Sequence, residues 1–486
     1  MKLQDPALFR TRGWVNGEWV EGRGGSWSVT NPATGASLGE VTRFTAEDTR
    51  AAIVAAEQAQ RGWRRETAAT RARIVRRFAD LMMQHQEDLA AILTAEEGKP
   101  LAESRGEIAY AASFLEWFSE EAPRAYGDVL PGHRADMRLL VQREPVGVSA
   151  AITPWNFPSA MITRKVGPAL ALGCAMVLKP AEDTPFSALA LAELSQRAGV
   201  PPGLFNVVVG DREDSQTIGA ELCQSPIVRK LSFTGSTAVG KHLLAQCAGT
   251  VKRVSLELGG NAPFIVFDDA DIEAALSGAM GCKFRNAGQV CIAANRFLVQ
   301  EGVYEEFAQA LGARIASLKV APGMEQGAQV GPLITEAGLA KVERHVEDAL
   351  TRGARVAVGG ERHGAGGTFY TPTLLLDATG DMVMSQEETF GPVAGLRRFS
   401  TEEEVLHIAN DTRSGLAAYF YSRDNARVWR MSEGLEYGMV GVNTGQVSAS
   451  VAPFGGMKES GLGREGSHFG CEEWLETKYV CIGGVS

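Results

Sequence analysis

The sequence predicts an α/β protein built from two units, each organised around a parallel β-sheet. With 486 residues, the chain is too long for a single hydrophobic core. From residue 146 onward, short apolar runs alternate with helical stretches, which is typical of a parallel sheet covered by helices on both faces. A second series of the same kind begins near Pro263. Two units of roughly two hundred residues each account for both series.

Composition narrows the possible classes of protein. Hydrophobic residues make up 45% of the chain and charged residues 22%, which excludes a disordered chain. The net charge is −10 and no Lys/Arg run forms a basic face, so we expect no nucleic-acid partner. The longest apolar stretch, near residues 169–178, is roughly half of a bilayer span, so we expect no membrane segment.

The cysteines and histidines also exclude some classes of site. The seven cysteines are scattered singly without a C-x-x-C pair, and the seven histidines form no H-E-x-x-H motif. This pattern predicts neither a disulfide framework nor a metal site. It favours a soluble protein in the reducing cytoplasm.

The individual elements can be predicted in chain order. Thr45-Ala-Glu-Asp48 is typical of a helix N-terminus, with a hydroxyl cap followed by acids. Residues 68–93 are predicted to form one long helix, because apolar side chains recur there at spacings of three and four. In the first series, strands are expected at residues 146–153, 176–178, 205–209 and 230–234, with helices at 184–198 and 236–246. In the second series, strands are expected at 263–267, 296–299, 416–421 and 439–443, with a helix at 337–352.

Six short segments carry most of the functional information. They are Thr153-Pro-Trp-Asn-Phe-Pro158, Lys179-Pro-Ala-Glu182, Phe233-Thr-Gly-Ser-Thr237, Glu257-Leu-Gly-Gly260, Gly288-Gln-Val-Cys291 and Glu388-Thr-Phe-Gly-Pro392. In order and spacing they resemble the aldehyde dehydrogenase superfamily over essentially the whole chain. The branch that the sequence resembles most is the succinate-semialdehyde dehydrogenases, through Pro158-Ser-Ala-Met-Ile-Thr-Arg-Lys165, Lys283-Phe-Arg-Asn-Ala-Gly-Gln289 and Pro453-Phe-Gly-Gly-Met-Lys-Glu-Ser-Gly-Leu-Gly-Arg464.

Cys291 matches the nucleophile of this family. A thiolate adds readily to an aldehyde carbonyl, and the thioester formed after oxidation can be hydrolysed. Cys291 follows the polar turn Asn286-Ala-Gly-Gln-Val, whereas Cys174, Cys223 and Cys247 lie in apolar or helical stretches and are expected in the core. Cys282, on a predicted helix before the turn, is the only nearby alternative.

Glu257 and Asn156 match the general base and the oxyanion donor. Glu257 ends an apolar run and precedes two glycines, a setting that suits a carboxylate with a raised pKa. On its residues alone, a carboxylate paired with Lys252 or Arg253 is the favoured interpretation, and the resemblance reverses this preference. Asn156 lies in a turn between two prolines, where its amide could join the N–H of Cys291 in binding an oxyanion, or simply form the turn.

The cofactor site departs from the usual dinucleotide fingerprint, because no G-x-G-x-x-G motif follows an early strand. Gly235 and Ser236 instead lie between a predicted strand and a helix, where backbone N–H groups can bind phosphate. The resemblance implies that Gly235 and Ser236 hold the cofactor phosphates, with further contacts from Trp155. It also implies that Lys179 and Glu182 hold the adenosine ribose, and Glu388 and Phe390 the nicotinamide ribose and ring.

Glu182 also bears on the choice of cofactor. A carboxylate accepts hydrogen bonds from a ribose 2′-OH and repels a 2′-phosphate. We therefore expect NAD to be preferred, with NADP possible because Lys179 could soften the repulsion.

The resemblance implies succinate semialdehyde as the substrate. Arg164 and Arg285 match residues that bind the substrate carboxylate in this branch, and Ser448 matches a third contact. Each arginine could instead form an ordinary salt bridge. Glutarate semialdehyde, one methylene longer, or another short ω-carboxy aldehyde is the alternative substrate. A catalytically silent protein of the same fold is the alternative outside enzymes.

The resemblance also implies a division of the chain into three parts. Residues 1–126 and 146–257 are expected to form the dinucleotide-binding domain, and residues 258–454 the catalytic domain. Residues 127–145 and 455–486 are expected to form a small β oligomerisation element and the C-terminal tail. Because an exposed strand edge needs covering, we expect a homodimer or homotetramer.

Overall fold

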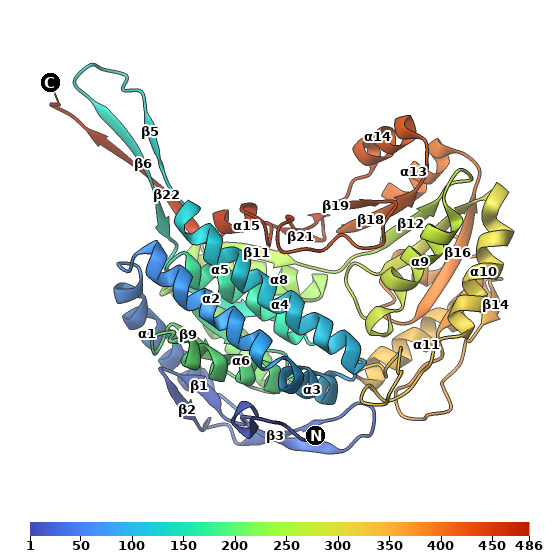
Figure 1. The fold of residues 1–486 in the computed structure, drawn as a ribbon, viewed down its shortest axis with the longest axis horizontal. Coiled ribbons are helices and arrows are strands. Elements are labelled where there is room, and N and C mark those ends of the chain that lie inside the picture. The colour runs from blue at the N-terminus through green and yellow to red at the C-terminus, as the bar shows by residue number, and fades with distance from the viewer. Residues whose placement is uncertain (486) are drawn as a thin grey trace.

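The computed structural model describes residues 1–485 and contains two lobes, each with its own β-sheet (Figure 1). The first sheet has eight strands, of which the four inner pairings β9–β8, β8–β7, β7–β10 and β10–β11 are parallel. In spatial order its strands are β2 (Glu18–Val20), β1 (Gly13–Val15), β9 (Phe205–Val207), β8 (Ala175–Lys179), β7 (Val148–Ile152), β10 (Val228–Thr234), β11 (Arg253–Glu257) and β21 (Gly461–Leu462). The predicted α/β class is therefore confirmed for this lobe, with antiparallel strands added at both sides of the sheet.

Helices pack around the first sheet and bury its apolar strands. The strands β7, β8 and β9 are nearly continuous apolar runs, as expected where both faces are covered. The helices of this lobe are α1 (Ala46–Trp63), α2 (Ala68–Gln84), α3 (Gln86–Glu97), α4 (Leu101–Glu121), α5 (Pro158–Ala171), α6 (Pro185–Ala198), α7 (Asp214–Gln224) and α8 (Thr237–Cys247). The capping signal at Thr45 is confirmed, since Thr45 and Asp48 form a reciprocal capping box at the start of α1.

The predicted helix over residues 68–93 is interrupted, and this expectation was wrong. The chain leaves helical geometry at His85, which ends α2 and precedes α3. The apolar spacing continues across the break, but the two helices have different surroundings. Helix α2 buries one face, whereas every residue of α3 from Asp88 to Glu97 is buried. A change of helix direction at His85 allows α3 to be enclosed on all sides.

The second lobe contains a sheet of seven strands in the order β14, β15, β16, β13, β12, β18, β19. Its strands are β14 (Arg355–Val358), β15 (Thr373–Leu376), β16 (Val393–Phe399), β13 (Ala294–Gln300), β12 (Ala262–Val266), β18 (Ala417–Tyr421) and β19 (Met439–Val442). Only β14 is antiparallel to its neighbour. Its helices are α9 (Ile272–Lys283), α10 (Tyr304–Ala316), α11 (Glu336–Thr351), α12 (Val383–Gln386), α13 (Glu402–Asn410) and α14 (Asn425–Gly434). The second predicted α/β unit is thus confirmed.

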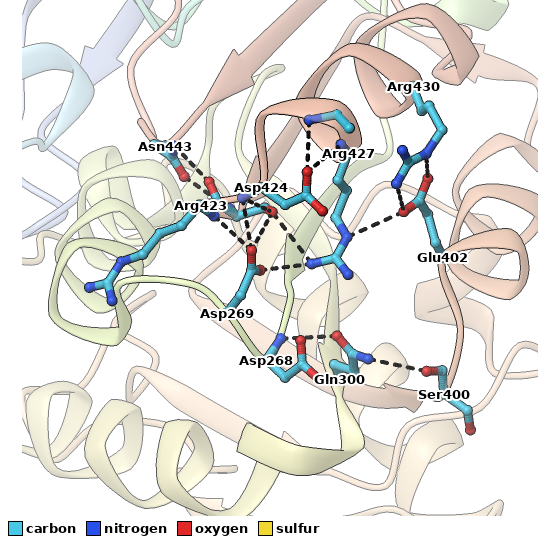
Figure 2. Close-up of polar contacts among 12 residues, drawn as sticks. Asp268, Asp269, Gln300, Ser400, Glu402, Arg423, Asp424, Arg427, Arg430 and Asn443 are labelled. Atoms are coloured by element: carbon cyan, nitrogen blue, oxygen red, sulfur yellow. Dashed lines mark hydrogen bonds and ion pairs between the residues drawn. The ribbon is translucent and has the colours of Figure 1, made fainter.

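A network of polar side chains covers the carboxyl ends of the strands in the second sheet (Figure 2). Asp269, beyond β12, accepts hydrogen bonds from the Ser422 hydroxyl and the N–H groups of Arg423 and Asp424, each at 2.9 Å. It also pairs with Arg427 at 2.8 Å. We refer to this region, centred on Asp269, Glu402 and Arg427, as the closed edge.

A three-stranded antiparallel sheet projects from the first lobe and carries the C-terminus (Figure 1). It consists of β5 (Asp128–Leu130), β6 (Arg138–Pro145) and β22 (Leu475–Ile482), with β6 in the centre. The expected small β-element is therefore present, and it joins two segments far apart in the sequence. Of the C-terminal segment, Gly461–Leu462 pairs instead with β11 of the first sheet.

Short elements complete the fold. The strand pairs β3 (Ser26–Thr30) with β4 (Ser37–Thr42) and β17 (Ser414–Gly415) with β20 (Met457–Lys458) form two small sheets, and α15 (Phe469–Glu472) precedes β22. None of the helices described here is both long and apolar enough to span a bilayer. Within residues 1–485, no group of three or more His, Cys, Asp or Glu side chains is arranged to hold a metal ion.

Candidate active site

A large cavity lies where the carboxyl edge of the first sheet meets the amino edge of the second. From the first lobe it receives the turn after β7 and the ends of β10 and β11. From the second lobe it receives the turn before β13 and the loop before β16. The cavity has a volume of about 630 Å³, and most of the predicted site residues line it: Asn156, Trp155, Arg164, Gly235, Ser236, Glu257, Arg285, Cys291, Glu388, Phe390 and Ser448. Lys179 and Glu182 do not line it and lie at the end of β8.

A strained turn presents Cys291 to this cavity. Asn286, Ala287 and Gly288 are all left-handed, with φ angles of 50°, 52° and 73°. This conformation is unfavourable for a residue with a β-carbon, and local contacts hold it in place. The Asn286 N–H donates to Glu103 at 2.8 Å, and the Asn286 amide donates to the Asn156 carbonyl at 3.0 Å. Gly288 has no alternative, because an added β-carbon would lie 2.2 Å from the Gly391 carbonyl oxygen.

Cys291 is distinguished from the other cysteines by its position. It is partly exposed, whereas the alternative Cys282 is buried, accepts the N–H of Ala294 at 3.3 Å and lies outside the cavity lining. Burial and the nearby Glu388 raise the pKa of the Cys291 thiol to about 12. Within the described chain, the N–H of Cys291 has no hydrogen-bond partner. The site therefore combines a neutral thiol with a backbone donor that is free to bind a ligand.

Glu257 lies buried at the end of β11 with both carboxyl oxygens unpaired among residues 1–485. Its possible partners Lys252 and Arg253 bind elsewhere: Lys252 donates to the carbonyls of Ser225 and Val228, and Arg253 pairs with Glu476. Burial, and then repulsion from Glu465, raises the pKa of Glu257 well above its usual value. A buried carboxyl group without partners and with a raised pKa is typical of a general base in a cleft.

A buried ionic network holds Asn156, and sequence reasoning missed it. The Lys99 ammonium donates to the Asn156 carbonyl at 2.5 Å and to Glu107 at 2.7 Å. The second Glu107 oxygen accepts the N–H groups of Ser159 and Ala160 at the start of α5. The Asn156 amide donates to the Gln289 carbonyl at 2.9 Å, which joins the two turns of the site. The only sequence signal was a charged pair, Glu97 and Lys99, beside an apolar helix.

The start of α8 has the features of a phosphate site. Ser236 caps the helix by accepting the Val239 N–H, and Gly235 precedes it. An added β-carbon at Gly235 would lie 2.4 Å from the Phe233 ring, so the close packing requires glycine. The Thr234 hydroxyl, at the end of β10, is buried without a partner in the described chain. Lys179 and Glu182 lie 3.5 Å apart beyond the cavity lining, and burial lowers the pKa of Lys179.

The loop before β16 contributes an acid and an aromatic ring. Glu388 accepts the Gly260 N–H at 3.3 Å, and burial raises its pKa to about 7. The rings of Phe390 and Trp155 meet edge to face with centroids 5.6 Å apart. Phe390 has a φ of 55°, so the backbone of this loop is left-handed where the ring enters the cavity.

Two arginines and a serine line one part of the cavity. The Arg164 guanidinium is buried, lies 2.8 Å from Glu465 and stacks 3.8 Å above the Phe454 ring. Its Nη2 atom has no hydrogen-bond partner within residues 1–485. Arg285 is exposed and forms no ion pair in the described chain. Ser448 bonds to the hydroxyl of Tyr110, a cavity residue that the sequence did not predict.

Comparison with known proteins identifies the family. The model of the aldehyde dehydrogenase family matches residues 19–480. The chain is 59% identical over 484 residues to the NADP(+) succinate-semialdehyde dehydrogenase of Escherichia coli, with 99% of this chain and 100% of that protein covered. It is 57% identical to the glutarate-semialdehyde dehydrogenase of Pseudomonas aeruginosa over the full length of both. Among solved structures, the succinate-semialdehyde dehydrogenase of Burkholderia pseudomallei is 57% identical, with a TM-score of 0.98 and coverage of 99% of this chain and 100% of that one. The chain belongs to the aldehyde dehydrogenase family.

Proposed function

We propose that this protein oxidises succinate semialdehyde to succinate, with a nicotinamide dinucleotide as electron acceptor. The observation that carries the proposal is a single cavity lined by the Cys291 thiol, the unpaired Glu257 carboxyl group and the guanidinium groups of Arg164 and Arg285. A thiol and a carboxyl base serve the oxidation of an aldehyde, and the guanidinium groups serve a substrate that also carries a carboxylate. The similarity to two semialdehyde dehydrogenases supports the same substrate class.

In the first half-reaction, the Cys291 sulfur attacks the aldehyde carbon and forms a thiohemiacetal. Because the pKa of this thiol is about 12, it must lose its proton to a base in the cavity. The unpaired N–H of Cys291 and the amide of Asn156 are the donors that stabilise the oxyanion.

In the second half-reaction, water hydrolyses the Cys291 thioester. Glu257, once deprotonated, takes a proton from this water and so generates the nucleophile. The glycines Gly259 and Gly260 let the Glu388 side chain and the Cys291 backbone approach the end of β11 closely. An added β-carbon at Gly259 would approach Glu388 to 3.0 Å, and one at Gly260 would lie 2.4 Å from the Cys291 carbonyl oxygen.

The residues around α8 and the Glu388 loop fit a nicotinamide dinucleotide. The capped start of α8, with Gly235 and Ser236, suits the phosphates, and the unpaired Thr234 hydroxyl lies beside them. Trp155, Glu388 and Phe390 would hold the nicotinamide end near Cys291, and Lys179 with Glu182 the adenosine ribose. When bound, a nicotinamide dinucleotide would supply the hydride acceptor for the oxidation.

We propose that NAD is preferred over NADP. The partly exposed Glu182 carboxylate suits a ribose 2′-OH and disfavours a 2′-phosphate. Lys179, 3.5 Å from this carboxylate, offsets part of its charge. The Escherichia coli relative carries NADP(+) in its name, so the cofactor ratio is a direct test of the Glu182 argument.

The substrate carboxylate is proposed to bind Arg164, Arg285 and Ser448. A guanidinium group can donate two parallel hydrogen bonds to a carboxylate, and Nη2 of Arg164 is available as a donor. Glutarate semialdehyde is the second candidate, because a relative of similar identity carries that name. One methylene changes binding by only about 1–3 kcal/mol in a pocket.

The projecting three-stranded sheet is proposed to mediate assembly into a homodimer or homotetramer. Its side chains Val129 and Tyr479 are 77% and 56% exposed, and β5 and β22 leave free strand edges. Exposed apolar side chains on an open edge favour pairing with another chain.

A panel of aldehydes, assayed for NADH and NADPH formation, tests this function. We expect the highest kcat/KM with succinate semialdehyde and NAD, a lower value with glutarate semialdehyde, and the lowest with butanal. Cys291→Ala is expected to abolish turnover while cofactor binding persists. Absence of turnover by the unmodified protein with every aldehyde would identify a catalytically silent member of the family.

A further inference from the structure

A second cavity lies in the second lobe and shares no lining residue with the cavity around Cys291. It has a volume of about 230 Å³ and lies between strands β13 and β16, the segment at residues 378–386 and the end of α13. Its charged side chains are Arg296, Arg397 and Asp411, and His407 also lines it. We call it the Arg397 cavity. Nothing in the proposed reaction uses it.

Arg397 has no partner for its charge. Within residues 1–485 its guanidinium forms no hydrogen bond and no ion pair. The next residue, Arg398, points to the opposite face of β16, as successive strand residues do. Arg398 pairs with Glu305 at 2.5 Å and lies 3.5 Å above the Tyr304 ring. The two arginines are adjacent in the sequence but have different surroundings: Arg398 has an ion-pair partner, whereas the half-buried Arg397 faces the cavity without one in the described chain.

Arg296 adds a second positive charge to the cavity. It is only 7% exposed, and it donates to the carbonyls of Asn261, Ile408 and Ala409 and to the Tyr437 hydroxyl. All these acceptors are neutral, so they satisfy its N–H groups without balancing its charge. Asp411 is the only acid of the lining, and it is exposed and forms no side-chain hydrogen bond in the described chain. The cavity therefore carries an excess of positive charge.

Two glycines allow the segments around the cavity to pack closely. An added β-carbon at Gly380 would lie 2.9 Å from Nη1 of Arg397, so the guanidinium lies directly beneath this segment. At Gly395, on the same face of β16 as Arg397, an added β-carbon would lie 2.5 Å from Cε of Met384. The volume is below the roughly 300–1,000 Å³ of pockets for drug-sized ligands. It suits a small ion.

We propose that the Arg397 cavity is a second anion-binding site, which takes a small oxyanion such as inorganic phosphate. An oxyanion accepts several hydrogen bonds from a planar guanidinium and would neutralise the excess positive charge of the cavity. The bound anion would contact Arg397 directly and would lie against the segment at residues 378–386, with His407 at the same cavity. This site does not depend on the proposed function.

Isothermal titration calorimetry with phosphate, at constant ionic strength, tests the site. Because the other cavity could also bind phosphate, at Arg285 and at the start of α8, the titration uses Arg285→Gln as the parent protein and is carried out with saturating NAD. We expect this parent to bind phosphate. Adding Arg397→Gln should weaken the apparent Kd by at least about tenfold, as expected for the loss of a charge-assisted bidentate contact. The matched change Arg398→Gln should leave the Kd unchanged.

Three outcomes would overturn the proposal. They are absence of phosphate binding by the Arg285→Gln parent, equal weakening by the Arg397 and Arg398 changes, and unchanged binding after Arg397→Gln. Crystals soaked in selenate give an independent readout, in which the expected anomalous peak lies beside the Arg397 guanidinium. Thermal unfolding in chloride checks that each variant is folded.

Discussion

The carboxyl edges of the two sheets have opposite character. In the first sheet, the strand ends leave polar groups without partners in the described chain, including both oxygens of Glu257 and the hydroxyls of Thr153 and Thr234. In the second sheet, the corresponding edge is the closed edge of Figure 2, where Asp269 accepts four hydrogen bonds and Glu402 binds Arg427 and Arg430. The polar groups at the edge of the first sheet are available to a ligand, whereas those at the edge of the second sheet bind one another.

This contrast explains where the site lies. Open α/β sheets generally bind ligands at the carboxyl ends of their strands, and the candidate active site lies at this edge of the first sheet but not of the second. The second sheet contributes from its amino edge, since Cys291 precedes β13 and Glu388 precedes β16. A buried polar group without a partner costs about 1–3 kcal/mol. We call the carboxyl edge of the first sheet the open edge. Its unpaired polar groups lower the stability of the fold, whereas the hydrogen bonds of the closed edge raise it.

The largest effect is expected at the open edge, where Glu257→Gln should lower activity without lowering stability. Loss of the base is expected to slow turnover by roughly 10²–10⁴, with a burst of NADH and an accumulated thioester. In the unmodified enzyme, kcat should rise with pH as Glu257 loses its proton, because only the carboxylate acts as a base. Steady-state and rapid-quench kinetics across pH check both expectations.

The same variant should be more stable than the unmodified protein at alkaline pH. The folded-state pKa of Glu257 is raised, so its contribution to stability is fully present below the unfolded pKa and is lost as pH rises through the folded pKa. Glutamine stays neutral and avoids that loss. Urea unfolding at acid and alkaline pH measures the difference. A Gln variant with normal turnover, or one that is less stable at alkaline pH, would contradict the contrast between the edges.

The next effect should be confined to stability, at the closed edge. Asp269→Ala removes four hydrogen bonds, and it is expected to lower the free energy of unfolding by about 2–3 kcal/mol because charged acceptors dominate this network. The kcat and KM of the folded enzyme should stay unchanged. Unfolding curves and kinetics on the same sample check this. A strong change in KM without loss of stability would mean that this edge also serves the substrate.

A smaller and selective effect is expected from Arg285→Ala. Loss of a charge-assisted hydrogen bond should weaken binding of succinate semialdehyde by about 1.5–3 kcal/mol, seen as a higher KM. Oxidation of butanal should change little, because it has no carboxylate. Arg164→Ala is the informative companion, since it should also destabilise the fold by leaving Glu465 with Lys165 alone among its close cations. Equal losses with both substrates would make Arg285 structural.

The smallest effect concerns the cofactor end of the open edge. Glu182→Ser should raise the kcat/KM ratio of NADP to NAD by about two- to fivefold, because one partly exposed charge is worth up to about 1 kcal/mol. Steady-state kinetics with each cofactor at saturating aldehyde provide the ratio. If the unmodified enzyme already uses NADP as well as NAD, Glu182 does not control the choice.

Local signals in the sequence predicted where helices begin better than they predicted what packs around each helix. The capping box at Thr45 and the cap at Ser236 depend on residues within one turn of each other, so both could be recognised directly. The break at His85 was missed because apolar spacing records which face of a helix is buried, and not a change in helix direction. The spacing of apolar residues shows that a segment is helical, but it does not show which other elements pack around that helix.

The sequence by itself determined the α/β class, the alternation of strands and helices, and the candidate residues that line the main cavity. These follow from short-range patterns and from motifs whose order is preserved along the chain. Tertiary structure alone decided which charges became buried partners: Lys99 reaches Asn156 across 57 residues, and Lys165 reaches Glu465 across 300. It also decided that one carboxyl edge stayed open and the other closed, because that depends on how two sheets and their connecting segments meet in space.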